Sequence, residues 1–510
     1  MREILNPKTM GDLITEQAAR EPDRIGLIFE GETFTYAQME ERSNKAAALF
    51  QSLDVHRGDR IAWIAQNLAV FWDALFGAAK IGAVLTPINW RLAPTEISQI
   101  LDDSGADILV AEQGFLDSLQ AVGVKLPAYV MVLGTGAGSF EDRLETANGD
   151  KQQSGVESDD IFVQLYTSGT TGLPKGVMLS HRAYHEFANA SSPLGIVNPK
   201  SDDEVALHAL PHFHVAGINF GLMAIARTMP ILQLRQFDPA AIVTAAQGDK
   251  PLNSFFVPAM IMMILEAAKQ MQVPLTKFAN MSYGAAPMPE PLLDVAMTAM
   301  PNASFTQVYG ATENCGAVTY LDHENHRPGL KQRVSAGKPW PRTSLKVCDP
   351  ETGESLAQGK TGEIWMQSGA VMDGYWRRDD ASSEVLVDGW YKTGDAGFLD
   401  ENGFLYVCDR IKDMIISGGE NIYPAELENI MADHPAVMES AVIGVPDDKW
   451  GEIVKVFVVR RAGADLSADN VTDFLADKIA KFKLPRQVEF LDALPRNASG
   501  KILKTELRKM

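Results

Sequence analysis

The alternation of short apolar runs with helical stretches constrains the fold of this 510-residue chain more than any other feature. Within the first 115 residues, runs typical of strands occur at Ile25–Phe29, Arg60–Ala65, Ala83–Pro87 and Asp107–Ala111. Stretches typical of helices lie between them, at Thr35–Leu53, Val70–Ile81 and Thr95–Asp103. The rhythm resumes at Phe162–Tyr166 and continues to Ser304–Val308. Because strands joined through helices pair in parallel, we predict an α/β fold whose parallel sheet is covered on both faces.

The pattern of the chain changes twice after this region. From about Pro328, short β-like runs such as Gly362–Met366 are separated by Gly, Asp and Pro, which predicts a small β-rich subdomain. From Ile411 to Met510 the pattern is α+β and is long enough for a core of its own. We therefore predict two domains, residues 1–411 with stacked α/β subdomains and residues 412–510, with the boundary near Lys412.

The charge balance is acidic, with 46 Lys and Arg against 66 Asp and Glu and a net charge of −20. A field of this sign disfavours nucleic acids and anionic membranes as partners. The cysteines Cys315, Cys348 and Cys408 are odd in number and far apart, which indicates a reducing compartment rather than a disulfide framework or a zinc site. The N-terminus has no apolar signal segment, and Val215–Ala226 is too short to span a bilayer. We expect a cytoplasmic protein without an integral membrane segment.

The motif with most chemical information is the segment Thr167–Gly176, which directly follows the expected strand Phe162–Tyr166. It combines four hydroxyl side chains, three glycines and the lysine Lys175. Glycine lets a backbone turn its N–H groups toward an anion, hydroxyls add donors, and lysine adds a positive charge. The motif therefore predicts a polyphosphate cradle, and a flexible surface turn is the alternative. It differs from the common P-loop, because Gly176 follows the lysine where that motif has Ser or Thr.

Further motifs occur in a fixed order after this segment. They are Tyr283–Pro287 (YGAAP), Tyr309–Glu313 (YGATE), Tyr391–Asp395 (YKTGD), Asp409–Asp413 (DRIKD), Ser417–Asn421 (SGGEN) and Pro495–Lys501 (PRNASGK). Together with the first motif, this set resembles the adenylate-forming superfamily of acyl- and aryl-CoA ligases, luciferases and adenylation domains. The resemblance covers about residues 10–510. One departure is Asp409, where the family usually has glycine.

The resemblance implies a reaction in two halves and a small, mobile C-terminal lid over a large N-terminal domain. A carboxylate first attacks the α-phosphate of ATP, giving an acyl-adenylate and pyrophosphate, and the thiol of coenzyme A then displaces AMP. It implies that Glu313 binds Mg²⁺, a hard cation that prefers carboxylate oxygens, and that Thr312 donates to the α-phosphate. It also implies a set of residues around the β- and γ-phosphates, namely Thr167, Ser168, Gly169, Thr170, Thr171, Gly172 and Lys175.

The same resemblance assigns the adenosine-binding residues. Gly284, Ala285 and Ala286 would lie against the flat adenine, and Tyr309, followed by Gly310, would stack on it. Asp395 would accept both ribose hydroxyl groups, and Arg410 would add a second contact to the ribose or a contact to a phosphate. Read without the family, Gly-Ala-Ala is a turn before a helix, and Tyr309 is a core aromatic.

Lys501 resembles the family's catalytic lysine, which would stabilise charge that develops during adenylation. Lys412 resembles the family's hinge. Rotation there would replace Lys501 by Gly418, Gly419 and Glu420, which would line the path of the thiol. Without the family resemblance, the sequence would indicate that Lys501 is a solvated surface lysine and that the glycines form an ordinary turn.

The histidines His208, His212 and His214 are close in sequence, but their spacing fits no metal site well. By resemblance, His214 orients the acid's carboxylate. The apolar stretch after His214, together with Val257–Met263, favours a fatty, aryl or sterol-side-chain acid. The alternatives are an enzyme that loads a carrier-protein thiol, a luciferase-like oxygenase and a non-catalytic nucleotide-binding regulator. The expected partners are the acid, ATP and CoA, and a homodimer is left open.

Overall fold

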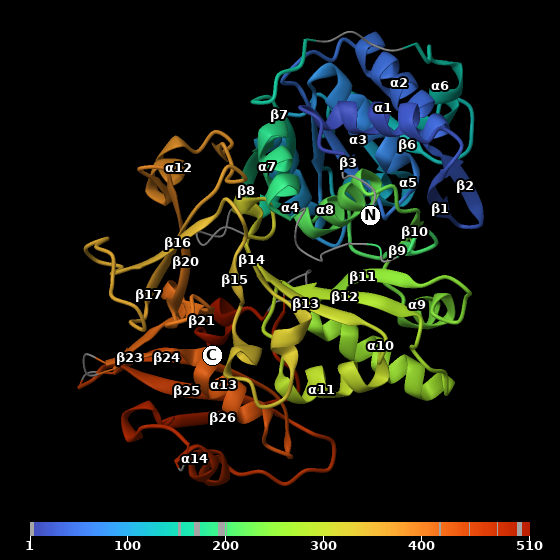
Figure 1. Ribbon diagram of the computed structural model, residues 1–510. Coiled ribbons are helices and arrows are strands. Elements are labelled where there is room, and N and C mark those ends of the chain that lie inside the picture. Colours follow the sequence, from blue (N-terminus) through green and yellow to red (C-terminus); the bar gives the residue numbers. More distant parts are fainter. Residues whose placement is uncertain are drawn as a thin grey trace. The chain divides into compact units, whose positions relative to one another are not determined.

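The computed structural model of the protein (Figure 1) divides into two compact units. The first comprises Met1–Ser344 and Met366–Tyr391, and the second comprises Leu345–Trp365 and Lys392–Met510. The predicted boundary near Lys412 lies inside the second unit and stays a prediction. The structure describes residues 5–150, 155–167, 174–191, 199, 201–417, 420–447, 449–476, 478–496 and 502–510.

The first unit contains a nine-stranded sheet whose centre is parallel and whose two edges are antiparallel. Its strands in spatial order are β15 (Lys338–Pro339), β14 (Thr319–Leu321), β13 (Ser304–Tyr309), β12 (Phe278–Gly284), β11 (Leu252–Phe256), β9 (Val205–His208), β10 (Ile231–Gln233), β1 (Ile25–Phe29) and β2 (Glu32–Thr35). The helices between these strands are α8 (Val215–Ala226), α9 (Pro239–Ala245), α10 (Pro258–Met271) and α11 (Glu290–Ala299). Helices α9, α10 and α11 lie together along β11–β13 (Figure 1), and their buried side chains share one core with these strands.

A second sheet of the first unit has seven strands. Their order is β18 (Gly374–Tyr375), β8 (Lys175–Ser180), β7 (Ile161–Thr167), β4 (Val84–Pro87), β3 (Arg60–Ile64), β5 (Ile108–Glu112) and β6 (Tyr129–Leu133). The strands from β7 to β6 are parallel, whereas β8 and β18 add antiparallel pairs at one edge. The helices of this region are α1 (Met10–Arg20), α2 (Tyr36–Ser52), α3 (Val70–Ile81), α4 (Pro94–Ser104), α5 (Gln113–Ala121), α6 (Phe140–Thr146) and α7 (His181–Ser191). The predicted α/β class with parallel sheets is confirmed.

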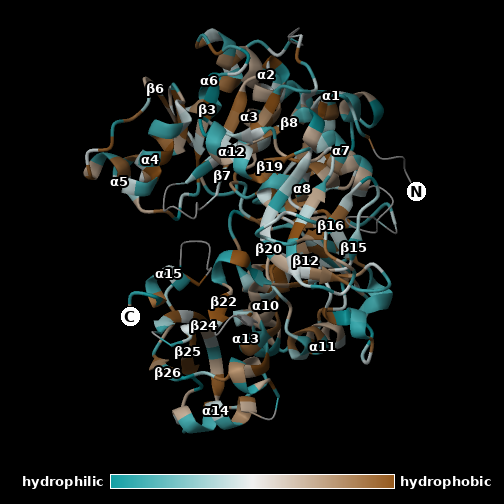
Figure 2. Cartoon of the chain, turned by 90° about the vertical axis from the view of Figure 1, so that its left-hand side faces the viewer, coloured by the Kyte–Doolittle hydropathy of each residue, from teal (hydrophilic) through white to brown (hydrophobic). Residues whose placement is uncertain are grey.

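Local sequence signals explain the helices of this region. Thr35 accepts from the Gln38 amide and forms a capping box at the start of α2, as its position before the helix predicts. Helix α3 has the predicted bounds, is buried on all sides and ends at the left-handed Gly82. Its apolar character is visible in Figure 2. The one lysine in α3, Lys80, stays buried because its ammonium donates to Glu40 at 2.6 Å and to two further oxygens on α2.

The second unit holds two small sheets. The first has the order β16 (Ser344–Cys348), β17 (Gly362–Gln367), β20 (Trp390–Leu399) and β19 (Leu386–Val387), with β21 (Leu405–Arg410) also paired to β20. The second has the order β23 (Glu420–Ile422), β22 (Ile415–Ser417), β25 (Gly451–Arg460) and β24 (Val437–Asp447), with β26 (Gln487–Leu491) paired to β25. Its helices are α13 (Pro424–Ala432), α14 (Ala468–Ala476) and α15 (Lys504–Leu507), and α13 and α14 share a core with the strands. Helix α12 (Asp379–Val385) and strand β19 (Leu386–Val387) belong to the first unit.

Within the described part of the chain, no helix is both long enough and apolar enough to cross a membrane.

Candidate active site

The two ends of the glycine-rich motif lie opposite each other in a β-hairpin. Strand β7 ends at Thr167 and strand β8 begins at Lys175, and these two residues are antiparallel partners. The motif therefore joins two paired strands, unlike the P-loop, which leads from a strand into a helix. Five of the predicted phosphate contacts lie outside the described residues, namely Ser168, Gly169, Thr170, Thr171 and Gly172.

Lys175 and Glu313 meet at the same aromatic side chain. The hydroxyl of Tyr375 donates to the Glu313 carboxylate at 3.0 Å. The Lys175 ammonium lies 4.8 Å from the centroid of the Tyr375 ring, a cation–π distance. Tyr375 reaches both because its strand β18 pairs with β8, two residues from Lys175 at Val177. One phenol therefore contacts an anion through its hydroxyl group and a cation through its ring.

Glu313 itself lies in a 3-10 turn, Thr312–Asn314, that follows strand β13. The turn is fixed because Asn314 Oδ1 accepts from the Ala311 amide at 2.9 Å, and the Glu313 carbonyl accepts from the Met372 amide at 2.8 Å. Gly310 is required before the turn, because a Cβ there would lie 2.6 Å from the Ala317 Cα. Thr312 and Glu313 are both partly exposed, so a ligand can reach them.

The predicted adenine-binding residues gather at the carboxyl ends of two neighbouring strands. Gly284 ends β12 and pairs in parallel with Val308, next to Tyr309 at the end of β13. A Cβ on Gly284 would lie 2.4 Å from the Val308 carbonyl oxygen, so only glycine fits. Ala285 has a left-handed backbone with φ +64°, which is rare for a residue with a Cβ. Ala285 and Ala286 are exposed, and Tyr309 is half-buried.

Parallel α/β sheets bind their ligands at the carboxyl edge of the strands. Gly284, Tyr309 and the turn with Thr312 and Glu313 all follow such strand ends, so the structure brings these predicted residues together.

The three clustered histidines have different environments. His208 and His212 are buried, with ring centroids 5.2 Å apart, and His212 stacks on Phe71 at 4.1 Å. The Nε2 atom of His208 lies 2.8 Å from the Gly217 carbonyl oxygen, and burial lowers its pKa to about 4. Two buried neutral rings in an aromatic cluster are core residues rather than ligands.

His214 is the exposed member of this group and occupies the N-cap position of α8, where its side chain makes no capping hydrogen bond. The surrounding protein lowers the pKa of its imidazole, and the positive charge of Arg91 adds to this effect. A neutral, accessible imidazole at this position can donate or accept a hydrogen bond from an acid.

The apolar residues of Val257–Met263, which were predicted to favour a hydrophobic acid, do not share one face of α10. Ile261 is fully buried in the core, whereas Met262 and Met263 are 56% and 48% exposed on the other side of the helix. Only residues spaced three or four apart share a helix face, so a run of consecutive apolar residues cannot form one wall.

Within the second unit, Asp395 and Arg410 are directly paired. They are partners in the register of β20 and β21, and the Arg410 Nε lies 2.6 Å from the Asp395 carboxylate. Asp395 is 7% exposed. The Thr393 hydroxyl accepts from the Asp395 amide at 3.0 Å and fixes the turn. The structure thus brings together Asp395, which the resemblance assigns to the ribose, and Arg410, which it assigns to the ribose or a phosphate.

Asp409, the departure from the family pattern, has a structural role. One carboxylate oxygen accepts a hydrogen bond from the backbone amide of Arg410 at 2.7 Å. The other accepts from the Ala425 amide in the first turn of α13 at 2.8 Å. A carboxylate at the N-terminus of a helix stabilises it through the unpaired amides and the helix dipole.

Gly418, Gly419 and Lys501 lie outside the described residues, and Glu420 is described only as the first residue of strand β23. Lys412 lies in a 3-10 turn, Ile411–Asp413.

One carboxylate is the expected contribution of a protein to a magnesium–nucleotide site, because Mg²⁺ takes its other ligands from phosphate oxygens and water. Glu313 fits this requirement, since it is partly exposed and its Oε1 atom accepts a hydrogen bond from Tyr375. Among the described residues, no group of three or more His, Cys, Asp or Glu side chains could hold a metal ion alone.

Tyr375 is the functional candidate that sequence reasoning missed. It lies outside every recognised motif, in a segment, Gly374–Trp376, without Asp, Glu, His, Cys, Lys or Arg. The only signal was the aromatic pair after Gly374, which is common in ordinary strands.

Comparison with protein families matches almost the whole chain. The profile of the AMP-binding enzyme family matches residues 14–376, and the profile of the AMP-binding enzyme C-terminal domain matches residues 426–501.

Individual relatives are similar over their full length. A fatty acid–[acyl-carrier-protein] ligase, ScoC of Streptomyces coeruleorubidus, is 37% identical over 98% of this chain and 96% of its own. The long-chain fatty acid–CoA ligase FadD13 of Mycobacterium tuberculosis is 35% identical, with 98% of each chain covered. A feruloyl-CoA synthase of Amycolatopsis is also 35% identical, over 98% of each chain.

Solved structures agree in fold. The o-succinylbenzoate-CoA synthetase MenE of Bacillus subtilis, in complex with its acyl-adenylate OSB-AMP, has a TM-score of 0.86 at 30% identity and 98% coverage of both chains. ATP-bound MatB of Rhodopseudomonas palustris has a TM-score of 0.88 at 29% identity and 99% coverage of both chains.

Proposed function

The chain belongs to the AMP-binding enzyme family, as an AMP-forming acid–thiol ligase of the adenylate-forming superfamily, and from this premise we propose that it joins a hydrophobic carboxylic acid to coenzyme A. Its cosubstrates are ATP and CoA, and its metal is Mg²⁺.

The proposed reaction balances in two steps. In the first, a carboxylate oxygen of the acid forms a bond to the α-phosphorus of ATP, and the bond to the β-phosphate oxygen breaks, so pyrophosphate leaves. In the second, the thiolate sulfur of CoA bonds to the acyl carbon, and AMP leaves with the former carboxylate oxygen. The thiol's proton passes to solvent or to a nearby base.

The observation that carries this proposal is that Glu313 and Lys175 both contact Tyr375, and that Lys175 lies in a hairpin whose connecting segment is rich in glycine and hydroxyl groups. Lys175 supplies positive charge to phosphate oxygens, and Thr312 donates to the α-phosphate. Glu313 holds Mg²⁺, which when bound neutralises charge on the phosphates. Tyr375 holds the Glu313 carboxylate in one orientation. These groups stabilise negative charge that shifts onto the leaving pyrophosphate.

The adenosine contacts in this proposal follow the positions of the strand ends. The adenine lies against Gly284, Ala285 and Ala286 and stacks on Tyr309, next to Gly310. The ribose hydroxyls donate to Asp395, whose orientation is held by Arg410. The unusual backbone of Ala285 supports a binding role, because strained residues of this kind concentrate at functional sites.

We assign the catalytic cation of the first step to Lys501 and the thiol path to Gly418, Gly419 and Glu420, on a lid formed by residues 412–510. The C-terminal family profile runs to residue 501, which supports the assignment of the lysine. A moving lid suits a site that must first exclude water and then admit a thiol.

The acid is proposed to be hydrophobic because the helix that begins at His214 is apolar. Asn219 is the only polar side chain in α8. His214 orients the carboxylate at the start of this helix. The proposed location is the cytoplasm, where ATP and CoA are available together, and a homodimer stays a prediction.

The second candidate function transfers the acyl group to the thiol of a carrier protein. It is favoured by the similarity to ScoC, a ligase that acts on an acyl-carrier protein. The two functions differ only in the acceptor, since the adenylation half is shared.

One experiment separates them. Pyrophosphate release and AMP release are measured over a panel of fatty, aryl and sterol-side-chain acids, with CoA, with a phosphopantetheinylated carrier protein or with neither. The proposal expects acid-dependent AMP release that is stimulated by CoA. Stimulation by the carrier alone would establish the second candidate, and no pyrophosphate release with any acid would contradict both.

A further inference from the structure

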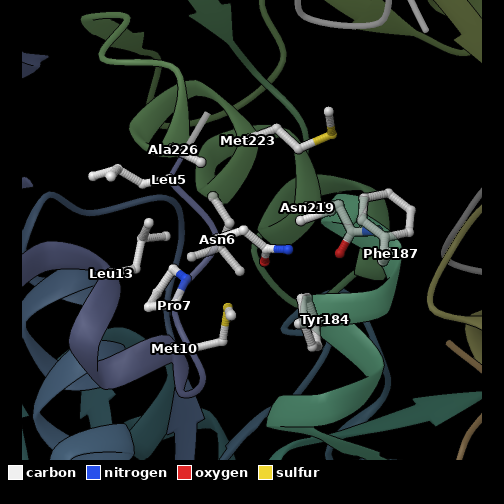
Figure 3. A pocket seen from close by; sticks show the side chains of 12 residues that line it. Leu5, Asn6, Pro7, Met10, Leu13, Tyr184, Phe187, Asn219, Met223 and Ala226 are labelled. Atoms are coloured by element: carbon white, nitrogen blue, oxygen red, sulfur yellow. The ribbon is translucent and has the colours of Figure 1, made fainter. Parts of the chain in front are cut away.

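The pocket shown in Figure 3 is a small packing cavity rather than a ligand site. Its volume is about 20 Å³, the space of one water molecule. Its lining is mainly aliphatic, aromatic and sulfur-containing, with side chains from α1, α7, α8 and the segment before α1. A polar network with more chemical information lies elsewhere in the first unit, beside the hairpin of β7 and β8.

The centre of this network is Asp103, in the last turn of α4. One of its carboxylate oxygens accepts from the Tyr166 hydroxyl at 2.7 Å, and the other accepts from the Arg378 guanidinium at 2.7 Å. Its backbone carbonyl accepts from the indole nitrogen of Trp376 at 3.1 Å. The side chain of Asp103 is 16% exposed. Asp103 therefore joins the end of β7, which leads into the candidate phosphate cradle, to the segment that follows Tyr375.

The contacts around Asp103 close into a cycle of five residues. The Tyr166 hydroxyl also accepts from the Gln164 amide at 3.0 Å, and Gln164 Oε1 accepts from the Arg60 Nε at 3.2 Å. The central guanidinium carbon of Arg60 lies 3.4 Å from the centroid of the Trp376 ring, a cation–π contact. Burial and the Asp103 carboxylate raise the pKa of Tyr166, so its phenol stays protonated and remains the donor. Because each member contacts two others, a rotation of any one breaks a contact.

The cycle holds Gly176, the residue that follows the candidate phosphate lysine. Tyr166 and Gly176 are antiparallel partners in β7 and β8. A Cβ on Gly176 would lie 2.8 Å from Gln164 Nε2 and 3.1 Å from Tyr166 Cζ, so these two side chains lie against the glycine. The Gly176 carbonyl accepts from the Trp376 amide at 2.8 Å. Gly176 is therefore held through its Cα and through its carbonyl, and both contacts come from members of the cycle.

We propose that Asp103 is a positioning residue for ATP, which acts through Tyr166 and Trp376 to hold the hairpin at Lys175 in the place where the β- and γ-phosphates bind. The inference rests on the proposed function and adds to it a residue outside the recognised motifs.

Positioning and simple charge predict opposite effects of removing Asp103. Its carboxylate has the same sign of charge as the phosphates, so through charge alone its removal would strengthen ATP binding. If Asp103 holds the hairpin in place, its removal weakens ATP binding, because Lys175 is no longer fixed against the phosphates.

Calorimetry of MgATP and AMP binding tests the inference without a turnover assay. In Asp103→Leu, the Kd for MgATP should rise about tenfold, the usual effect of losing a charged hydrogen bond. The Kd for AMP should stay unchanged, because AMP lacks the β- and γ-phosphates. Asp103→Asn keeps one oxygen as an acceptor and should lie between the wild type and Asp103→Leu. Asp102→Leu, which removes the same charge at the exposed neighbouring position, is the control and should leave both constants unchanged.

A second variant tests the link through the phenol. Tyr166→Phe keeps the aromatic ring against Gly176 and removes only the hydroxyl, so it should also raise the Kd for MgATP. The double variant with Asp103→Leu should show no further rise from the loss of the phenol, because the two changes remove the same contact. If Asp103→Leu does not fold, Tyr166→Phe tests this contact by itself.

An unchanged or lower Kd for MgATP in Asp103→Leu, or in Tyr166→Phe where the first variant does not fold, would overturn the inference. An equal rise of the Kd values for MgATP and AMP would also overturn it, since that result would indicate a general structural role. A wild type that does not bind MgATP would overturn the proposed function and this inference together. Binding of MgATP without acid-dependent pyrophosphate release would contradict the proposed function alone.

Discussion

Tyr375 donates its phenolic hydrogen to the carboxylate of Glu313 at 3.0 Å, and a backbone hydrogen bond from Met372 to the Glu313 carbonyl at 2.8 Å joins the same two segments again. The two bonds tie the segment around β18 to the turn after β13. The ring of Tyr375 also faces Lys175 at 4.8 Å. The candidate metal ligand and the candidate phosphate lysine are therefore positioned by one side chain.

Tyr375→Phe keeps the ring below Lys175 and removes the hydrogen bond to Glu313. We expect the Mg²⁺ concentration for half-maximal pyrophosphate release to rise about tenfold, with a smaller change in the KM for ATP, because a charged hydrogen bond is lost. A magnesium titration at saturating ATP measures this shift. Tyr375→Leu removes the ring as well and should raise the KM for ATP too. If Tyr375→Phe shifts both constants equally, Tyr375 does not act through Glu313.

Asp409→Gly replaces this residue by the one that the family usually has. The N-terminus of α13 should lose about 1 kcal/mol, the usual effect of removing a cap, because the Ala425 amide loses its acceptor. Hydrogen exchange in the first turn of α13 should accelerate, and adenylate formation should be unchanged. Asp433→Gly, at the other end of α13, is the matched control and should leave these amides slow. Unchanged exchange in Asp409→Gly would show that the carboxylate does not cap the helix.

Acid should destabilise the first unit through its buried histidines. Burial lowers the pKa of His208 from 6.5 to about 4, so the unfolded chain binds a proton before the folded chain does as the pH falls. The contribution of a neutral His208 is complete above pH 6.5 and is lost progressively toward pH 4.

In His208→Gln, the difference between the unfolding free energies at pH 7 and pH 5 should shrink by about 2 kcal/mol, at 1.36 kcal/mol per pKa unit. Urea unfolding at the two pH values measures this difference. An identical pH dependence in the variant would mean that His208 titrates normally in the folded state.

Lys501→Ala should slow adenylate formation by about 10²–10³, because one preorganised contact to developing charge is removed. Thioester formation from supplied acyl-adenylate should be spared, since the proposed lid brings other residues to the site in that step. Single-turnover assays of the two halves measure this separation. Lys509→Ala, an exposed lysine near the C-terminus, is the control. Equal loss in both halves would refute the assigned role.

Elements whose signal is local could be predicted from the sequence. Helix α3 has its predicted bounds, because it is apolar throughout and ends at Gly82.

Pairing between distant segments could not be predicted. Strand β1 precedes β3 in the chain, but the two strands lie in different sheets. Strand β1 pairs with β10, which comes more than 200 residues later in the sequence. Periodicity reports which face of a strand is buried, but it does not report its neighbour. The partnership of Tyr375 with Glu313 has the same origin, because only the pairing of β18 with β8 brings the phenol there.

The family motifs indicated which residues belong to the site, but they did not indicate how these residues contact one another. The sequence assigned Asp395 and Arg410 to one ligand without revealing that they are ion-paired, since that contact depends on the register of β20 and β21.

The most direct test of the central claim follows the oxygen atoms of the acid. An accepted acid labelled with ¹⁸O in both carboxylate oxygens is converted with MgATP and CoA, and the products are analysed by mass spectrometry. Attack of the carboxylate on the α-phosphorus predicts one ¹⁸O atom in each AMP and none in pyrophosphate. Unlabelled AMP, or label in inorganic phosphate with formation of ADP, would contradict the account.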